Sequence, residues 1–225
     1  MNKRHSLFIG AVFSIAYSLP VTAATEFPVT ARLFVGAVST DPKDVNTEMK
    51  AESLKEFGTI TQFGAEATYP LAKLIDVGFR YTLRTSKVTE NPDDSITDYY
   101  ADLKQEAVSG VVRVPILNTS IVKLDVFGAV GGTNTTLKIK TLSQEGELNK
   151  KGDNGWFGSM VANYGASVAV GYKGFYFVVE GGYEDNKAKD LKRTGTVNTN
   201  IETIDISGSY ISVGLMFDGV KATKK

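Results

Sequence analysis

The amino-acid sequence predicts an all-β protein: an eight-stranded antiparallel up-and-down transmembrane β-barrel. Two observations support this fold class. From Thr30 onward the dominant period of side-chain character is two, and the connections between the alternating segments are long and short in strict turn. Successive side chains of a β-strand face opposite sides, so a period of two gives each strand one apolar and one polar face.

The alternating segments predict strands at about 30–39, 58–69, 74–88, 99–114, 120–140, 157–171, 175–188 and 203–217. The gaps between these ranges are 18, 4, 10, 5, 16, 3 and 14 residues. Outer-membrane barrels have short periplasmic turns and long outer loops, and an even strand number returns the chain to its starting side. A soluble sandwich or soluble barrel has no physical reason for this alternation.

The segment 74–88 shows the two faces most clearly. One face is apolar and the other mostly polar: Ile75, Val77, Phe79, Tyr81 and Leu83 against Asp76, Gly78, Arg80, Thr82 and Arg84. In a membrane barrel the apolar face points to lipid and the polar face lines the lumen. Glu106 is out of phase with its neighbours, which predicts a β-bulge near 104–107.

Aromatic residues gather at both ends of the predicted strands, as interfacial girdles do. We expect the girdle at the short-turn end to contain Tyr69, Tyr172, Phe175 and Phe217, and the girdle at the long-loop end to contain Phe57, Tyr99, Tyr100, Trp156 and Phe157.

The first long gap has the signals of a short helix. Asp41 is the expected N-cap, Pro42 the first helical residue and Gly58 the residue that stops the helix.

The N-terminal residues predict an export signal at 1–24. Lys3 and Arg4 precede an apolar stretch from residue 7 to 19, and small residues at Ala23 and Ala24 suit signal peptidase. The mature barrel is then expected at 25–225, with its strands between about 30 and 217 and a short tail at 218–225. No later apolar run approaches the roughly 18 residues that a membrane helix needs.

Composition argues against several functions. Removing residues 1–24 removes two of the 25 basic residues and none of the 25 acidic ones, so the mature chain has a formal charge of −2. This balance argues against a nucleic-acid binder. The chain has no Cys, and its only His, His5, lies in the expected signal. A His-dependent hydrolase site or a His/Cys zinc site is therefore excluded, and we expect no enzyme activity, no metal and no cofactor.

The predicted polar faces carry ionisable residues well inside the strands, and three of them predict a lumenal ion-pair network. Strand phase puts Glu66, Arg80 and Glu180 in the lumen at similar depths. The second and third strands form a hairpin, so Arg80 can reach Glu66 diagonally, whereas Glu180 must reach it across the lumen. We expect Arg80 to be the cation of a network that plugs the barrel.

Two of the long gaps have charge character. The gap around Glu90, Asp93, Asp94 and Asp98 is acidic. The start of the last gap is basic, with Lys187, Lys189, Lys192 and Arg193. Such runs are most often solvated loop charge. The functional interpretation is contact between the basic segment and lipopolysaccharide phosphates.

With its expected signal, strand number and loop alternation, the chain resembles small bacterial outer-membrane barrels of the OmpA membrane domain and OmpX type over roughly residues 30–217. The segment Tyr210-Ile211-Ser212-Val213-Gly214-Leu215-Met216-Phe217 is similar to the terminal assembly signal of that family. The family signal usually ends the chain, whereas here eight residues follow Phe217. The resemblance implies an outer-membrane location, contact with lipid and lipopolysaccharide, and insertion by the barrel assembly machinery.

The sequence leaves three functions open. The first is a structural or surface-interaction barrel, monomeric and acting through four extracellular loops. The second is a narrow channel for small solutes, and the third a soluble periplasmic barrel that binds an apolar ligand. Eight strands enclose an interior that side chains just fill, which favours the first.

Overall fold

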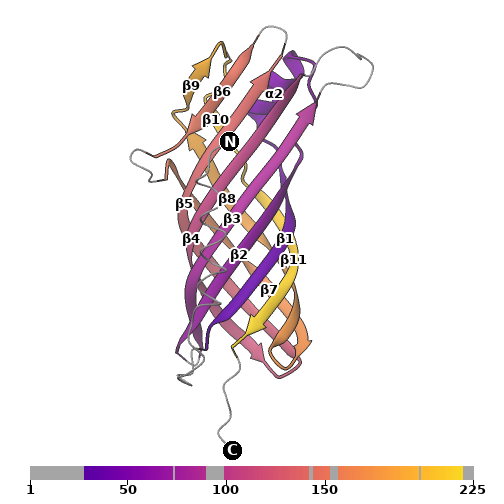
Figure 1. Cartoon of the computed structure of the whole chain (residues 1–225), viewed down its shortest axis with the longest axis vertical. Helices are drawn as coiled ribbons and strands as arrows, with labels where there is room; N and C mark the ends of the chain where they lie inside the picture. The colour runs from indigo at the N-terminus through magenta and orange to yellow at the C-terminus, as the bar shows by residue number, and fades with distance from the viewer. Residues whose placement is uncertain are drawn as a thin grey trace, which may run out of the picture. The chain divides into compact units, whose positions relative to one another are not determined.

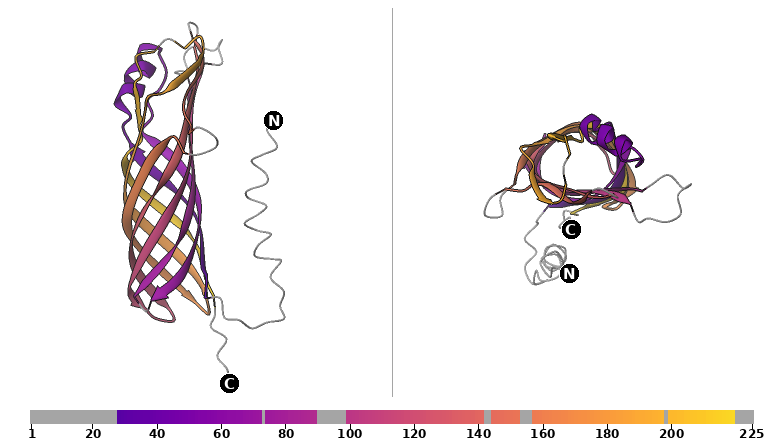
Figure 2. Two further views of the ribbon diagram at one scale, coloured as in Figure 1. Left: turned by 90° about the vertical axis from the view of Figure 1, so that its left-hand side faces the viewer. Right: turned by 90° about the horizontal axis from the view of Figure 1, so that it is seen from above.

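The computed structural model describes residues 28–72, 74–89, 99–141, 144–152, 157–197 and 199–219. Eight strands form a closed antiparallel barrel, as the sequence predicts (Figures 1 and 2). They are β1 (Thr30–Thr40), β2 (Thr59–Ala72), β3 (Ile75–Thr89), β4 (Tyr100–Asn118), β5 (Val122–Lys140), β7 (Ser159–Tyr172), β8 (Phe175–Lys189) and β11 (Gly208–Asp218). The barrel closes where β1 pairs with β11, from Thr30 opposite Asp218 to Thr40 opposite Gly208.

The connections alternate as predicted, with three short turns at one end of the barrel and four long connections at the other. The turn between β7 and β8 consists of Lys173 and Gly174, whose φ angles are 53° and 84°. A two-residue hairpin turn with two positive φ angles matches the twist of its strands, and glycine adopts it without steric cost. The register shifts lie at Pro70/Ala72 and Pro115/Leu117, so the bulge expected near 104–107 is absent.

Three short strands at the long-loop end extend the barrel wall, and the sequence did not predict them as separate elements. β6 (Glu145–Lys150) pairs with the outer part of β5, and β9 (Lys192–Gly195) pairs with β6. β10 (Thr203–Asp205) pairs with β8. The predicted strand 203–217 is therefore present but interrupted at residues 206 and 207, since β10 and β11 pair with β8 in one continuous register, from Thr203 opposite Lys189 to Phe217 opposite Phe175.

The helix in the first long connection is present, but both of its predicted ends are wrong. α2 (Lys43–Ala51) has Pro42 as its N-cap, and Asp41 instead accepts a hydrogen bond from the Asn46 side chain (3.0 Å). At the other end the amides of Ser53 and Leu54 donate to the carbonyls of Lys50 and Met49. This Schellman arrangement, with Ser53 at φ 61°, ends the helix before Gly58 is reached.

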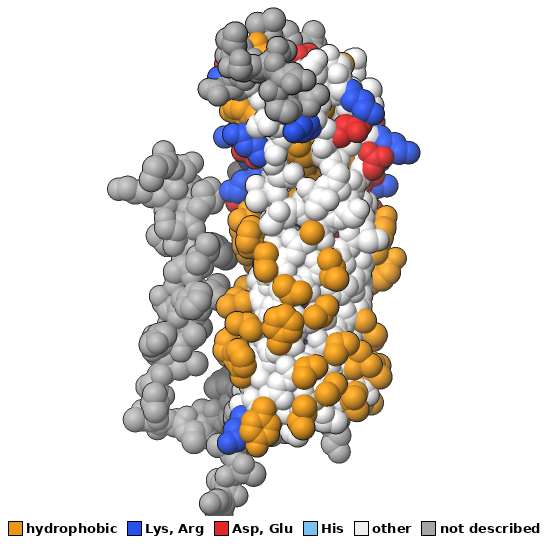
Figure 3. Space-filling model, turned by 90° about the vertical axis from the view of Figure 1, so that its right-hand side faces the viewer, with side chains coloured by type: hydrophobic (Ala, Val, Ile, Leu, Met, Phe, Trp, Pro, Cys, Tyr) orange, Lys and Arg blue, Asp and Glu red, His pale blue; other side chains and the backbone are white. Residues whose placement is uncertain are grey.

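The outer face of the barrel is apolar around the whole circumference near the short-turn end. Exposed apolar side chains come from all eight strands, among them Leu33, Phe63, Phe79, Val112, Val130, Val168, Phe177 and Ile211. Figure 3 shows this belt, with the charged side chains gathered above it. A tilted strand needs about 9–11 residues to cross a bilayer. The outward apolar positions of β3, from Ile75 to Leu83, fit that length.

The interior has the opposite order of polarity. At the level of the belt the buried inward residues include charges such as Arg80 and Arg113, whereas at the long-loop end they are apolar, such as Val38, Ile60 and Leu137. The outward residues at that end are polar and charged, as at Lys87, Lys104 and Asp185. Where the barrel faces lipid, its outer face is therefore apolar and its inner face polar. Beyond the membrane the order is reversed, with apolar residues inside and polar residues outside, as in a soluble protein.

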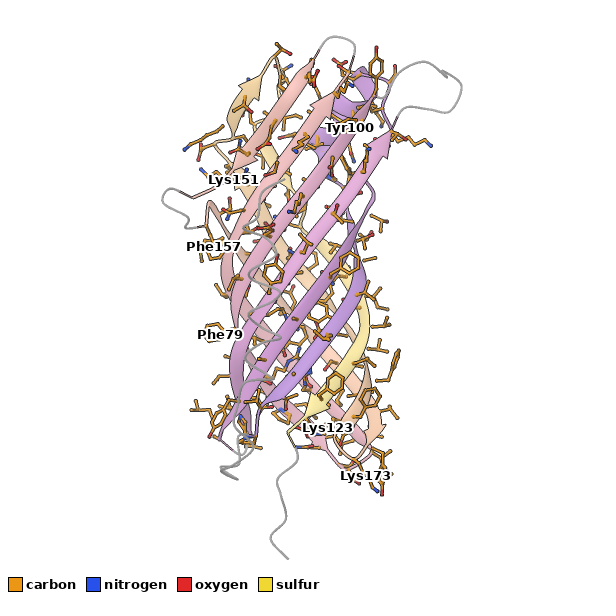
Figure 4. The ribbon with its side chains drawn as sticks, in the orientation of Figure 1. Phe79, Tyr100, Lys123, Lys151, Phe157 and Lys173 are labelled. Atoms are coloured by element: carbon orange, nitrogen blue, oxygen red, sulfur yellow. The ribbon has the colours of Figure 1, made fainter. Side chains whose placement is uncertain are left out.

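Aromatic side chains form the expected girdle at the short-turn end, where Tyr69, Tyr172, Phe175 and Phe217 are all exposed. The girdle predicted at the other end is partly wrong. Phe57 is buried, with 1% of its surface exposed, and Tyr100 lies near the outer tip of β4 (Figure 4). Phe157 does lie exposed on the outer face, with its ring over Gly132.

No helix within the described residues is both long enough and apolar enough to cross a bilayer.

Candidate functional site

Six charged side chains meet in the lumen at the level of the apolar belt, each from a different strand. We call this set the central ion network: Arg32, Glu66, Arg80, Arg113, Asp125 and Glu180. The three residues expected together from the sequence, Glu66, Arg80 and Glu180, are brought together. Arg80 Nε donates to Glu66 Oε2 (2.8 Å) and Arg80 Nη2 donates to Glu180 Oε2 (2.8 Å). Glu66 and Arg80 lie directly opposite each other rather than diagonally, because the hairpin turn is shorter than expected.

Arg113, and not Arg80 alone, joins the network together. Its Nε donates to Glu66 Oε1 (2.6 Å), its Nη2 donates to Glu180 Oε2 (2.6 Å), and its Nη1 bonds Asp125. The residue is completely buried, with 0% exposed surface. It lies on the lumenal face of β4, and no local sequence pattern indicates that three carboxylates converge on it.

Arg32 completes the network from the strand that closes the barrel. Its Nη1 donates to Glu66 Oε1 (2.8 Å) and its Nη2 donates to Asp125 Oδ2 (3.0 Å). Glu66 is thus bonded to all three arginines, and three cations face three carboxylates. Buried charges are tolerated when they are paired and hydrogen-bonded in this way.

Two phenylalanines that face the lumen against the general pattern have a clear role there. The guanidinium of Arg80 lies 5.0 Å from the Phe34 ring centre and 4.7 Å from the Phe127 ring centre, and that of Arg113 lies 4.4 Å from Phe127. The aromatic faces stabilise the cations and fill the space between them. The Phe34 ring occupies the volume that a side chain at Gly64 would need.

A second polar layer lies on the outer side of the central ion network. Arg84 forms an ion pair with Glu184 and donates to Gln105 Oε1 (2.9 Å). The side chains of Gln105 and Asn186 exchange hydrogen bonds of 2.7 and 3.0 Å, and Asn186 also donates to Glu184 (2.8 Å). Arg84 is therefore as buried as Arg80, and is not a peripheral residue of the outer mouth.

The short-turn mouth has a smaller charged group. Lys123 pairs with Asp218, which also accepts a hydrogen bond from the Thr30 hydroxyl (2.8 Å). Lys123 also lies 4.8 Å from the Tyr176 ring centre. Figure 4 shows Lys123 at this end of the barrel, above Lys173 of the turn. Asp218 follows the terminal aromatic Phe217, so the residue that departs from the family signal helps to join β1, β5 and β11.

The long-loop end is closed by an apolar cluster that we call the outer cap. It joins the ends of the barrel strands to α2, β6, β10 and the segment 196–206, through side chains that include Val45, Met49, Leu54, Phe57, Leu103, Leu137, Ile139, Leu148, Ile201, Ile204 and Ile206. Asn46 fixes α2 to the chain that returns to β2, because its amide exchanges hydrogen bonds of 2.8 and 2.9 Å with the backbone of Phe57.

The basic residues expected to contact lipopolysaccharide are divided between two surfaces. Lys187 and Lys189 face outward on the part of β8 beyond the apolar belt, and Lys192 lies opposite Asn149 on β9. Arg193 lies opposite the buried Leu148 and donates to the Ile201 carbonyl (3.5 Å). Asp205, 3.4 Å from the Lys187 ammonium, raises the pKa of Lys187 through its charge.

Several sequence expectations fall outside the described residues: the export signal at 1–24, the acidic residues Glu90, Asp93, Asp94 and Asp98, and Trp156. Within the part of the chain that the structure describes, no group of three or more His, Cys, Asp or Glu side chains is arranged to hold a metal ion.

No family model and no curated protein matches this chain. Solved structures match it in fold. The outer membrane protein OprG from Pseudomonas aeruginosa aligns with a TM-score of 0.52 at 14% identity, over 84% of this chain and 94% of OprG. The fold and the lipid-facing belt together decide the class. The chain is a bacterial outer-membrane β-barrel.

Two further outer-membrane barrels align less well. Ail of Yersinia pestis, in complex with the heparin analogue sucrose octasulfate, has a TM-score of 0.48 at 13% identity, over 85% of this chain and 99% of Ail. The outer membrane protease OmpT of Escherichia coli has a TM-score of 0.37 at 9% identity, over 88% of this chain and 99% of OmpT. At these identities the likenesses concern the fold alone.

The apolar belt leads to the first experimental expectation. The outer-membrane barrel should sediment with outer membranes and need detergent for extraction, because its outer face would otherwise expose apolar side chains to water. It should also migrate differently on gels before and after heating. Full recovery in a detergent-free periplasmic extract would contradict the expectation.

Proposed function

We propose that the protein is a non-conducting, non-enzymatic outer-membrane barrel that acts through a rigid surface at its outer end. The observation that carries the proposal is that side chains block the lumen at two successive levels. The central ion network and the layer around Arg84 fill it within the membrane, and the outer cap closes it beyond.

The lumenal packing supports the absence of conduction. Arginine side chains from three strands span the interior and are held by carboxylates on strands that face them. A cavity beside Arg32, Phe34, Glu180 and Ser212 measures about 10 Å³, room for roughly one water molecule. A channel would require these side chains to separate, which unpairs buried charges. The narrow channel stays the alternative function.

The outer cap supports a surface-interaction role. Among the described residues, three of the four long connections contribute buried side chains to one apolar core, and Tyr99 of the remaining connection packs against it. This core fixes the conformation of the surface above it. The Gln144 side chain further ties the third connection to α2, since its Nε2 donates to Glu52 Oε1 (2.9 Å). A preordered surface binds a partner without the entropic cost of ordering loops. The partner class that we propose is a component of the cell surface or of a host surface.

Contact with lipopolysaccharide belongs to the same proposal. Lys187, Lys189 and Lys192 point away from the barrel beyond the apolar belt, where the phosphates of the outer leaflet lie. Lys187 also pairs with Asp205, and Arg193 faces the other way. Insertion through the terminal strand Tyr210–Phe217 by the assembly machinery, and a monomeric state, are proposed with it.

A non-enzymatic role is supported by the state of the lumenal carboxylates. General acid–base catalysis needs a carboxyl group that can exchange a proton with a substrate. Glu66 and Glu180 are instead each bonded to at least two arginines and buried. The chain beyond residue 24 also has no His or Cys to act as base or nucleophile.

The purified barrel in a planar lipid bilayer is expected to show no stepwise ion conductance, because side chains of the described residues fill the lumen at the ion network and at the outer cap. Denatured barrel in the same detergent is the control for leakage caused by detergent. Conductance steps from the folded barrel, at a frequency that scales with protein concentration, would contradict the proposal and favour the channel.

A further inference from the structure

The charged residues of the lumen are divided unequally between the two halves of the chain. The lumenal faces of β1 to β4 carry four arginines and two acids, a formal charge of +2: Arg32, Arg80, Arg84 and Arg113 with Glu66 and Asp76. Those of β5, β7, β8 and β11 carry one lysine and four acids, a formal charge of −3: Lys123 with Asp125, Glu180, Glu184 and Asp218. One wall of the lumen is therefore basic and the facing wall is acidic.

Four ion pairs cross the lumen in the same direction, whereas the Lys123–Asp218 pair at the short-turn mouth lies within the second half. In each of the four an arginine of the first half meets a carboxylate of the second half on a strand that is not its neighbour: Arg32 with Asp125, Arg80 with Glu180, Arg113 with Glu180 and Arg84 with Glu184. Glu66 is bonded to all three arginines of the central ion network from within the basic wall. It offsets part of their mutual repulsion within the basic wall.

Two of these pairs form matched rungs between β3 and β8. Arg80 pairs with Glu180, and four residues further along both strands Arg84 pairs with Glu184. Both strands run from the short-turn end to the long-loop end, so the two rungs lie at two successive depths. Sliding one wall along the other by two residues, the smallest shift that keeps the faces, would unpair both rungs together.

We infer that this division of charge is a closing device: attraction between the basic and acidic walls brings the two halves together, and the two rungs set the depth at which they meet. β1 and β11 can then pair in their native register. Opposite charges attract over several ångströms in a medium of low dielectric constant. Salt shortens that range, from about 10 Å at 0.1 M to about 3 Å at 1 M.

The test measures the rate at which full-length urea-unfolded barrel folds into detergent micelles, followed by gel mobility without heating. Arg84→Gln with Glu184→Gln removes the outer rung and keeps side chains of similar size. We expect this variant to fold several-fold more slowly than the unaltered barrel at 0.1 M salt. At 1 M salt, where screening removes the attraction, the two rates should approach each other.

The matched control also removes one positive and one negative charge, but from the outer face of the barrel. Lys87→Gln with Asp102→Asn neutralises cross-strand neighbours that face outward beyond the belt, and we expect it to fold at the unaltered rate with unaltered salt dependence. Equal salt dependence in the neutral-rung variant and the unaltered barrel would overturn the inference.

Exchanging the two charged residues of the outer rung tests whether the attraction between opposite charges, rather than the particular side chain at each position, sets the folding rate. Arg84→Glu alone is expected to slow folding by about tenfold or more, since it places two carboxylates together, and the added Glu184→Arg should restore most of the rate. A reversed pair that folds as slowly as Arg84→Glu alone would overturn the inference. If Arg84→Glu alone does not fold, folding of the reversed pair supports the inference, and the salt dependence of the neutral rung still tests it.

Discussion

Arg113→Ala is expected to lower the free energy of unfolding in detergent by about 3–5 kcal/mol, the range for unpairing a buried charge. The substitution removes the partner shared by Glu66, Asp125 and Glu180 and leaves carboxylates with fewer cations. Lumenal water that enters the vacated volume would hydrate them and reduce the loss. Urea titration of the barrel in micelles, followed by gel mobility and circular dichroism, measures the change.

Arg193→Ala is the matched control for this change. Arg193 is exposed and donates a long hydrogen bond to the Ile201 carbonyl, so its loss should cost less than about 1 kcal/mol. Arg80→Ala should lower the free energy of unfolding by nearly as much as Arg113→Ala, because Arg80 contacts two carboxylates. Arg84→Ala should lower it by less, since Arg84 pairs with one carboxylate. Equal effects from Arg113→Ala and Arg193→Ala would show that the network adds nothing to stability.

The same substitution tests the plug. Arg113→Ala opens space within the membrane-spanning part of the lumen, whereas the outer cap above it is unchanged. We therefore expect bilayer conductance to stay near zero until the cap is also weakened. Conductance from Arg113→Ala alone would show that the outer cap does not close the mouth.

The barrel could be predicted from the sequence because lipid imposes one rule on every strand. Each crossing segment must alternate, and every reversal must be a short turn or a long loop, so strand number and direction follow from local patterns. The same phase argument placed Arg80, Glu66 and Glu180 on one lumenal surface. Arg113 did not stand out, because two of its three partners, Glu66 and Glu180, lie on strands that are not its neighbours.

The outer cap could not be predicted from the alternation of side chains, for a physical reason. Past the membrane the strands reverse polarity, so Leu137 and Ile139 face inward on the same face as Asp125. A period of two is unchanged by that reversal. Phe57 was placed in a girdle because an aromatic near a strand end fits an interface. Phe57 is buried in one apolar cluster with α2 and the segment 196–206. The helix carries no strand pattern, and the segment 196–206 lies far from Phe57 in sequence.

Phe57→Ala is expected to lower the stability of the outer cap by about 3–5 kcal/mol, as for a large aromatic removed from a packed core. Phe57 also holds Asn46 through its backbone, so the cavity lies beside the anchor of α2. The barrel within the membrane should stay folded, because Phe57 belongs neither to its ion network nor to its paired strands. Protease added to intact cells should therefore cut the outer connections of this variant faster, while the mobility shift on heating persists.

Phe79→Ala is the control with the same side chain in the opposite environment. Phe79 lies on the lipid-facing side with 73% of its surface exposed, and Figure 4 shows it pointing out from the barrel wall. It loses contacts with lipid and leaves no cavity, so we expect protease resistance of the outer end to be unchanged. Equal protease sensitivity of Phe57→Ala and the unaltered barrel would mean that the cap is held by its hydrogen bonds rather than by its core. A loss of the heat-dependent mobility in Phe57→Ala would mean instead that cap and barrel unfold as one unit. The rigid surface proposed for partner binding would then depend on the barrel as a whole.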